Sequence, residues 1–205
     1  EFDFQYNLMY DSIFSIWGKR GSGKTSAIFT LKYRLEKKNK NDLFLPIIMP
    51  EMLPVNCDII GWILAVLDSE VSKLENIIKN NISLTDDDEF FKHCVFDPNN
   101  NKLRVSYKKT KELASSRNMR SFGWERSYAE NIGYTERYTQ NSYDFSRQLA
   151  DFWDILVQSI KKAYGMRTNE EPLIYIMFDD VDLTPDKVVE LFSVIIKYLS
   201  HPNLI

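Results

Sequence analysis

A glycine-rich segment, Gly18-Lys19-Arg20-Gly21-Ser22-Gly23-Lys24-Thr25, most constrains what this chain can fold into. The run before it, residues 12–17, is β-branched and aromatic, which predicts a buried strand. After it, apolar residues recur at helical spacing, at Ala27, Ile28, Leu31 and Leu35. The segment matches G-x-x-x-x-G-K-[ST] at every position and lies between a predicted strand and a predicted helix. This pattern predicts a loop that binds phosphate groups.

The residue types of the segment suit that chemistry. Glycines allow successive backbone N–H groups to converge on phosphate oxygens. We expect Lys24 to place its charge at the β and γ oxygens as a catalytic residue, and the Thr25 hydroxyl to ligate Mg²⁺. The residues expected to bind the nucleotide are Gly18, Lys19, Arg20, Gly21, Ser22, Gly23, Lys24, Thr25 and Ser26.

Two acids, Asp179 and Asp180, follow a second apolar run at residues 173–178. Ligands bind at the carboxyl ends of strands in open α/β sheets, so acids at this position indicate a metal and water site. We expect Asp179 to hold Mg²⁺ and Asp180 to polarise an attacking water as a catalytic residue. The alternative is that Asp180 and Asp182 only begin a turn and cap a helix at Thr184.

Strand-like and helix-like segments alternate on both sides of a long central region. Strands are expected at 44–49 and 173–178, and helices at 58–80, at 143–165 and after Thr184. This alternation favours an α/β fold with a parallel sheet. The predicted organisation is the first half of a core at 1–80, an inserted lobe at 81–142 and the second half of the core at 143–205.

Several of the predicted helices have an apolar face or a capping residue. Asp58 is a candidate N-cap and Gly165 a candidate left-handed C-cap. The apolar residues expected to be buried are Ile60, Ile63, Leu67, Val71, Leu74 and Ile78 in the first helix, Phe145, Leu149, Phe152, Leu156, Ile160 and Tyr164 in the second, and Val188, Phe192, Ile195 or Ile196, and Leu199 in the third.

The loop "GKRGSGKTS" together with "IMFDDVD" resembles the P-loop ATPases of the AAA+, STAND and KAP branch. The resemblance implies a three-layer P-loop NTPase sheet that is mostly parallel, MgATP as ligand, hydrolysis of the γ-phosphate, and a homo-oligomeric ring or nucleotide-gated assembly. The chain is also similar to the ATPase component of RADAR-type antiphage systems, which implies a partner effector such as an adenosine deaminase. The sensor and arginine-finger residues of such ATPases would lie beyond Ile205.

The segment from 92 to 142 contains ten basic and five acidic residues, although the whole chain has a net charge of −3. Aromatic residues are interleaved with the basic ones, at Phe122, Trp124, Tyr128, Tyr134 and Tyr138. One hypothesis is a nucleic-acid surface, with cations for phosphates and rings for bases. The alternative is a small subdomain whose aromatics form its own core, or a contact between subunits.

The remaining features of the composition point to the cytoplasm. The two cysteines, Cys57 and Cys94, suggest no disulfide framework. No apolar run approaches the roughly 20 residues of a membrane span, so no membrane association is expected. Because the chain opens on Glu1 without a methionine and ends as an apolar strand begins, we expect it to belong to a longer polypeptide.

Three functions follow as hypotheses. The first is a Mg²⁺-dependent ATPase that uses Lys24, Thr25, Asp179 and Asp180. The second is a nucleotide-gated switch that binds ATP and hydrolyses it slowly or never. The third is an initiator or loader ATPase that engages DNA or RNA.

Overall fold

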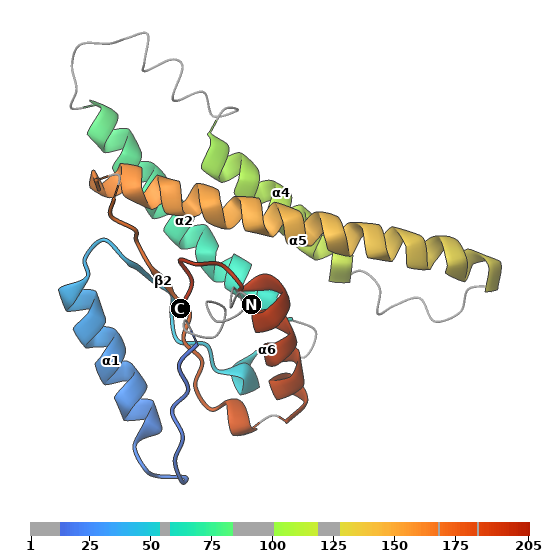
Figure 1. Cartoon of the computed structure of the whole chain (residues 1–205), viewed down its shortest axis with the longest axis horizontal. Helices are drawn as coiled ribbons and strands as arrows, with labels where there is room; N and C mark the ends of the chain where they lie inside the picture. The colour runs from blue at the N-terminus through green and yellow to red at the C-terminus, as the bar shows by residue number, and fades with distance from the viewer. Residues whose placement is uncertain (1–12, 54–57, 84–100, 119–127, 168, 184) are drawn as a thin grey trace, which may run out of the picture. The chain divides into compact units, whose positions relative to one another are not determined.

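The computed structural model describes residues 13–53, 58–83, 101–118, 128–167, 169–183 and 185–205 (Figure 1). Of residues 82–83, 116–118, 128–142, 182 and 185–186 it describes the backbone. The chain forms two compact units. The first unit comprises Glu1–Trp62 and Ile160–Ile205, and the second comprises Ile63–Ser159.

The first unit is built around two short strands that pair in parallel. Its elements in chain order are α1 (Lys24–Lys38), β1 (Leu43–Phe44), the short helix η2 (Pro50–Met52), β2 (Ile174–Tyr175), the short helix η3 (Val181–Leu183) and α6 (Pro185–Tyr198). Leu43 pairs with Ile174, and Phe44 pairs with Tyr175. A parallel bridge between Ile48 and Phe178 continues this pairing beyond the strands.

β2 is the central element of this small sheet. On one side it pairs with β1, and on the other Ile174 forms a parallel bridge with Leu204. The rings of Phe44 and Tyr175 stack across the strand pair, 4.5 Å apart and 2° from parallel. Leu45 and Ile174 are fully buried, so the sheet forms the core of the first unit.

The predicted three-layer, mostly parallel P-loop sheet is not found. The described part of the chain is mostly helical, and its only named strands are β1 and β2. Two of the expected strands, at 44–49 and 173–178, are present as β1 and β2, but each is shorter than predicted. Residues 13–17 form no strand, and their large side chains are exposed, with Phe14 at 77% and Trp17 at 87%. An apolar run forms a strand only when a neighbour completes its hydrogen bonds, and no described residue does so for 13–17.

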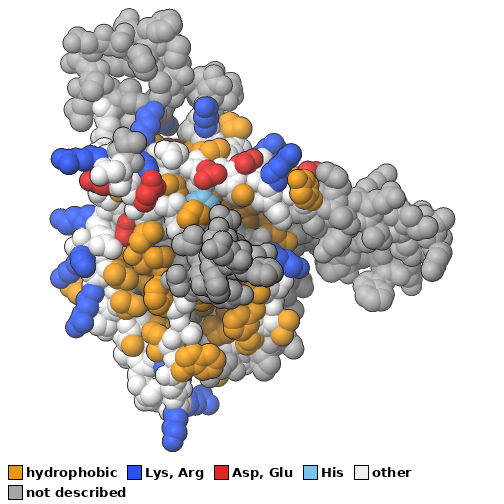
Figure 2. Space-filling model, in the orientation of Figure 1, with side chains coloured by type: hydrophobic (Ala, Val, Ile, Leu, Met, Phe, Trp, Pro, Cys, Tyr) orange, Lys and Arg blue, Asp and Glu red, His pale blue; other side chains and the backbone are white. Residues whose placement is uncertain are grey.

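The apolar faces predicted for α1 and α6 also differ from the structure. α1 has no buried residue, and Leu31 is 45% exposed. In α6 the buried residues are Leu191 and Val194, whereas Phe192 is 55% exposed. Figure 2 shows hydrophobic side chains exposed over this unit. Helical spacing places residues on one face, but it does not determine which face meets a neighbour.

The second unit is a helical bundle made from α4 (Lys102–Asn118), the greater part of α2 (Ile59–Ser83) and the greater part of α5 (Tyr128–Tyr164) (Figure 1). Asp58 caps α2 as predicted, because its Oδ1 accepts a bond of 2.6 Å from the Gly61 N–H. Gly165, with φ of 61°, follows α5 in the predicted left-handed conformation. Most of the predicted faces of these two helices are buried, at Ile60, Ile63, Leu67, Val71, Leu74, Phe145, Leu149, Phe152, Leu156 and Ile160, whereas Ile78 is half-buried and Tyr164 is 43% exposed.

Polar contacts join α4 to α2, and an aromatic contact joins it to α5, within the second unit. The Arg104 guanidinium donates to the Glu75 carboxylate at 2.6 Å and to Asp68 Oδ1 at 3.0 Å. The Tyr107 hydroxyl donates to the Leu64 carbonyl at 2.8 Å, and its ring lies 5.9 Å from that of Phe152. These contacts fix the register of α4 against α2 and α5.

The described part of the predicted lobe at 81–142 consists chiefly of α4 and the beginning of α5. Phe122 and Trp124 lie outside the described residues, as do the side chains of Tyr128, Tyr134 and Tyr138. Within the described ranges, no helix has the length and apolarity needed to cross a membrane.

Candidate phosphate-binding site

The glycine loop, residues 18–23, joins an exposed extended segment to the first turn of α1. Gly21 and Gly23 have φ of 80° and 87°, in the left-handed region that glycine enters without the clash a Cβ would create. A hydrogen bond of 3.1 Å from the Ser22 N–H to the Lys19 carbonyl closes the turn formed by residues 19–22. The two glycines are therefore required by the backbone conformation of the loop.

α1 begins at Lys24 with its first N–H groups unbonded within the helix. The first backbone bond of the helix runs from the Ala27 N–H to the Gly23 carbonyl, at 2.9 Å. Gly23 is the N-cap and supplies no side-chain acceptor. The N–H groups of Lys24, Thr25 and Ser26 thus remain available at the positive end of the helix dipole, an arrangement that suits an anion.

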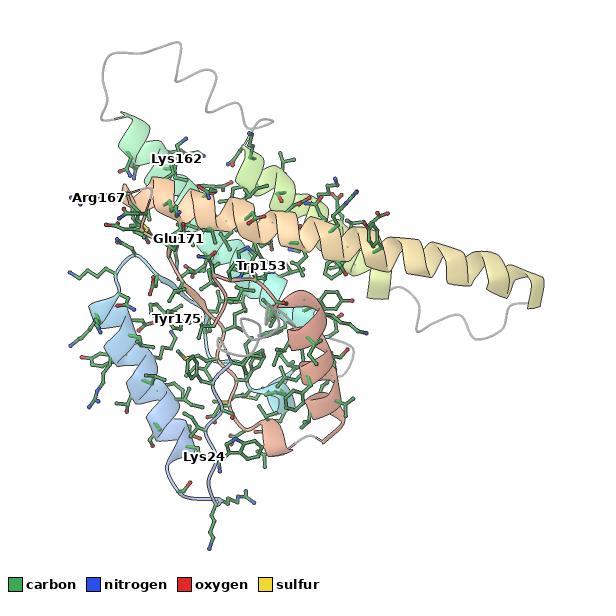
Figure 3. The ribbon with its side chains drawn as sticks, viewed as in Figure 1. Lys24, Trp153, Lys162, Arg167, Glu171 and Tyr175 are labelled. Carbon is green, nitrogen blue, oxygen red and sulfur yellow. The ribbon has the colours of Figure 1, made fainter. Side chains whose placement is uncertain are left out.

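Lys24 folds back over the loop that precedes it. Its Nζ donates to the Gly18 carbonyl at 2.9 Å and to the Lys19 carbonyl at 3.3 Å. Figure 3 shows Lys24 at the end of α1 where the loop joins the helix. Sequence reasoning assigned Lys24 to phosphate but did not foresee these two carbonyl acceptors. They hold the ammonium group beside the loop N–H groups.

Asp179 is a buried acid four residues beyond the end of β2. Its N–H donates to the Ile48 carbonyl at 3.0 Å, and the residue is 4% exposed. Its Oδ2 is buried and has no hydrogen-bond partner among the described residues. A buried carboxylate oxygen without a partner is costly, and one common explanation is a bound ion. The role of Ile48 could not be anticipated, because it depends on the strand register.

Asp180 has an unusual backbone conformation. Its φ of 52° is the one positive value at a non-glycine residue in the described part of the chain. Its carbonyl accepts a bond of 3.2 Å from the Leu183 N–H, which holds the turn into η3. Aspartate tolerates this region better than most residues, but the conformation still stores strain of the kind found at functional sites. The turn of the predicted alternative is therefore present, whereas Thr184, the expected helix cap, lies outside the described residues.

The residues of the loop lie together in the structure, whereas the two acids form no hydrogen bond with them. No hydrogen bond or ion pair among the described residues joins Lys24 or Thr25 to Asp179 or Asp180. The described residues contain no group of three or more His, Cys, Asp or Glu side chains that could hold a metal. Mg²⁺ in phosphate sites takes only one or two protein ligands besides phosphate and water. The exposed Thr25 hydroxyl and the unpartnered Asp179 Oδ2 are suitable donors for such an ion.

Comparison with known proteins adds no family to this geometry. No protein-family model matches the sequence, and a search of curated proteins found no match.

Proposed function

We propose that this chain binds MgATP at the glycine loop and hydrolyses the γ-phosphate. The observation on which the proposal depends is the conformation of the loop. Two left-handed glycines lead into an uncapped helix, and the ammonium group of Lys24 lies over the loop. Backbone donors and the Lys24 ammonium group at a helix N-terminus match the geometry and charge of a polyphosphate.

In this proposal the phosphates replace two carbonyl acceptors of Lys24. Charge-assisted bonds to phosphate oxygens are stronger than bonds to neutral carbonyls, so the exchange favours the nucleotide. Thr25 and Asp179 would hold Mg²⁺, which supplies positive charge to the β and γ oxygens. Asp180 would accept a hydrogen bond from the attacking water and orient it.

The base of the nucleotide is not read by these residues. Every contact proposed for residues 18–26 is to phosphate or metal, so the choice of ATP over GTP depends on the resemblance to AAA+, STAND and KAP ATPases. The first binding measurement should therefore compare ATP with GTP at the same Mg²⁺ concentration.

The test is nucleotide affinity and phosphate release measured on the same variants. Lys24→Ala should weaken MgATP binding roughly 10- to 100-fold, since a bond to a charged group contributes about 1.5–3 kcal/mol. Asp180→Asn should leave affinity within about twofold and lower turnover by roughly 10²–10⁴. Asp179→Asn should weaken binding in the presence of Mg²⁺ and change binding little in EDTA.

Two matched controls remove the same charges elsewhere. Lys38→Ala lies at the far end of α1 and Asp151→Asn on an exposed position of α5, and both should behave as wild type. Binding without phosphate release in the wild-type protein would replace the ATPase with the nucleotide-gated switch. An affinity that Lys24→Ala leaves unchanged would overturn the site itself.

A further inference from the structure

Four lysines lie on the solvent-exposed half of α4 and have no acidic partners among the described residues. Lys102, Lys108, Lys109 and Lys111 are exposed. No ion pair or hydrogen bond of the described residues involves their ammonium groups, although Lys111 approaches the Tyr107 ring at 5.7 Å. These four residues are named the α4 lysine face.

The acids that could neutralise this face are bound to another residue. Asp68 and Glu75 of α2 are the partners of Arg104, which lies on the same helix. Arg104 is therefore not available to a partner molecule, unlike the residues of the α4 lysine face. Glu112 is the one exposed acid among the described side chains of α4, so the face keeps a strong positive excess.

Helix geometry explains why the lysines face outward together. Leu103, Tyr107, Thr110 and Ala114 are buried at spacings of three and four residues, and they turn the opposite side of α4 to solvent. Lys102 and Lys109 are seven residues apart, which is roughly 10 Å along the helix axis at about 1.5 Å per residue. The lysines thus span a length over which several backbone phosphates can be contacted.

The chemistry of the face favours nucleic acid over a membrane or a protein. Val105, 46% exposed, is the one large hydrophobic side chain exposed on the described part of α4. An amphipathic helix on a membrane inserts an apolar face, and the apolar face of α4 is already buried in the bundle. Protein interfaces are enriched in aromatic residues and depleted of lysine at their centres, which is the opposite of this surface.

The same surface favours a duplex over a single strand. Proteins that bind single strands stack bases on exposed aromatic rings. The ring of α4, that of Tyr107, is 2% exposed and cannot stack on a base. Cations without rings contact phosphates alone, and such contacts carry no sequence information.

We propose that the α4 lysine face binds the phosphate backbone of duplex nucleic acid without sequence preference. This inference is independent of ATP binding, because it concerns only residues of the second unit.

The test is the affinity of the whole chain for a labelled random-sequence DNA duplex of 20 base pairs, measured by fluorescence anisotropy from 50 to 200 mM salt. If all four lysines contact phosphates, wild-type affinity should fall roughly 100-fold across this range, at a slope of about 0.9 per contact. Replacing the four lysines with glutamine should abolish most of this salt dependence. Replacing them with arginine should preserve it.

A control variant replaces four exposed lysines of the first unit with glutamine and so changes the net charge equally. These lysines are Lys37, Lys38, Lys40 and Lys162. The control should keep at least a third of the wild-type affinity, and circular dichroism should show that every variant is folded. Equal loss in the two glutamine variants would overturn the proposal, because binding would then depend on net charge alone. Tighter binding of a single strand, or of a poly-glutamate peptide at the same salt, would also overturn it.

Discussion

The interior of the second unit and the glycine loop with α1 differ in nearly every measure of packing. Trp153, Tyr107, Phe145 and Phe152 are fully buried in the bundle. Residues 13–22 are all exposed, and α1 has no buried residue. Both regions hold tryptophan, tyrosine and arginine, so the same residue types can be compared in two environments.

This difference separates the residues that stabilise the fold from those that would bind a ligand. A segment with few buried contacts adds little to the free energy of unfolding and is free to change conformation when a ligand arrives. The loop nevertheless has a defined backbone, fixed by Gly21 and Gly23. Substitutions of the same residue type in the two regions should therefore have very different effects on stability.

The largest contrast is expected between Trp153→Ala and Trp17→Ala. Trp153 is 1% exposed and packs on the Phe152 ring at 5.4 Å, so its removal leaves a cavity that should cost about 3–5 kcal/mol. Trp17 is 87% exposed, and its loss should change stability by less than about 0.5 kcal/mol. Urea unfolding followed by circular dichroism measures both values. Equal losses would mean that residues 13–17 are packed in solution.

A second contrast is expected between Arg104→Met and Arg34→Met. The hydrogen bond with Glu75 and the nearby acids raise the pKa of Arg104 further above its ordinary value, so the charged form is stabilised by the fold. Methionine keeps much of the packing but leaves Glu75 without its main partner, which should cost about 2 kcal/mol. Arg34 is exposed on α1, and no ion pair of the described residues involves it.

The methionine variant of Arg34 serves as the control in the same unfolding experiment, and its stability should match that of wild type. A double variant, Arg104→Met with Glu75→Gln, should recover part of the loss, since it removes the carboxylate left unpaired. No recovery would mean that the loss in Arg104→Met does not come from the unpaired Glu75 carboxylate.

Much of the second unit could be predicted from the sequence because helix faces follow from local spacing. The buried residues of α2 and α5 lie at the positions that periodicity indicates, and Asp58 caps α2 as its residue type suggests. The role of Arg104 was missed, because a sequence shows charges but not which of them meet. Only the packing of α4 on α2 reveals that Arg104 differs from the lysines beside it.

The fold of the first unit was predicted less well, because a sheet depends on pairing between distant segments. The sequence indicates strands near Phe44 and Ile174, and the structure pairs them in parallel, but the sheet layers inferred from the resemblance are not present. For the candidate site, the glycine positions follow from residue type alone. The unpartnered Oδ2 of Asp179 and the positive φ of Asp180 have no signal in the sequence, since burial and backbone strain are set by tertiary structure.

The smallest contrast is expected between Tyr107→Phe and Tyr33→Phe, and it depends on pH. Burial, with a smaller contribution from Asp68, raises the pKa of Tyr107 to about 12 from an ordinary value of 10.0. The folded protein therefore holds the phenol proton more tightly than the unfolded chain does. The resulting stabilisation is complete below about pH 10 and is lost as the pH rises from about 10 towards 12.

At neutral pH, Tyr107→Phe should cost about 1 kcal/mol, because it removes the hydrogen bond to the Leu64 carbonyl. Between pH 10 and 12 the wild-type protein should lose stability faster than this variant, so the two unfolding curves converge. Tyr33 is 57% exposed, and its phenylalanine variant should follow the wild-type curve because the buried phenol is still present. Parallel curves for wild type and Tyr107→Phe would mean that this hydroxyl reaches water in solution, and the packing contrast between the two regions would then be weaker than the structure indicates.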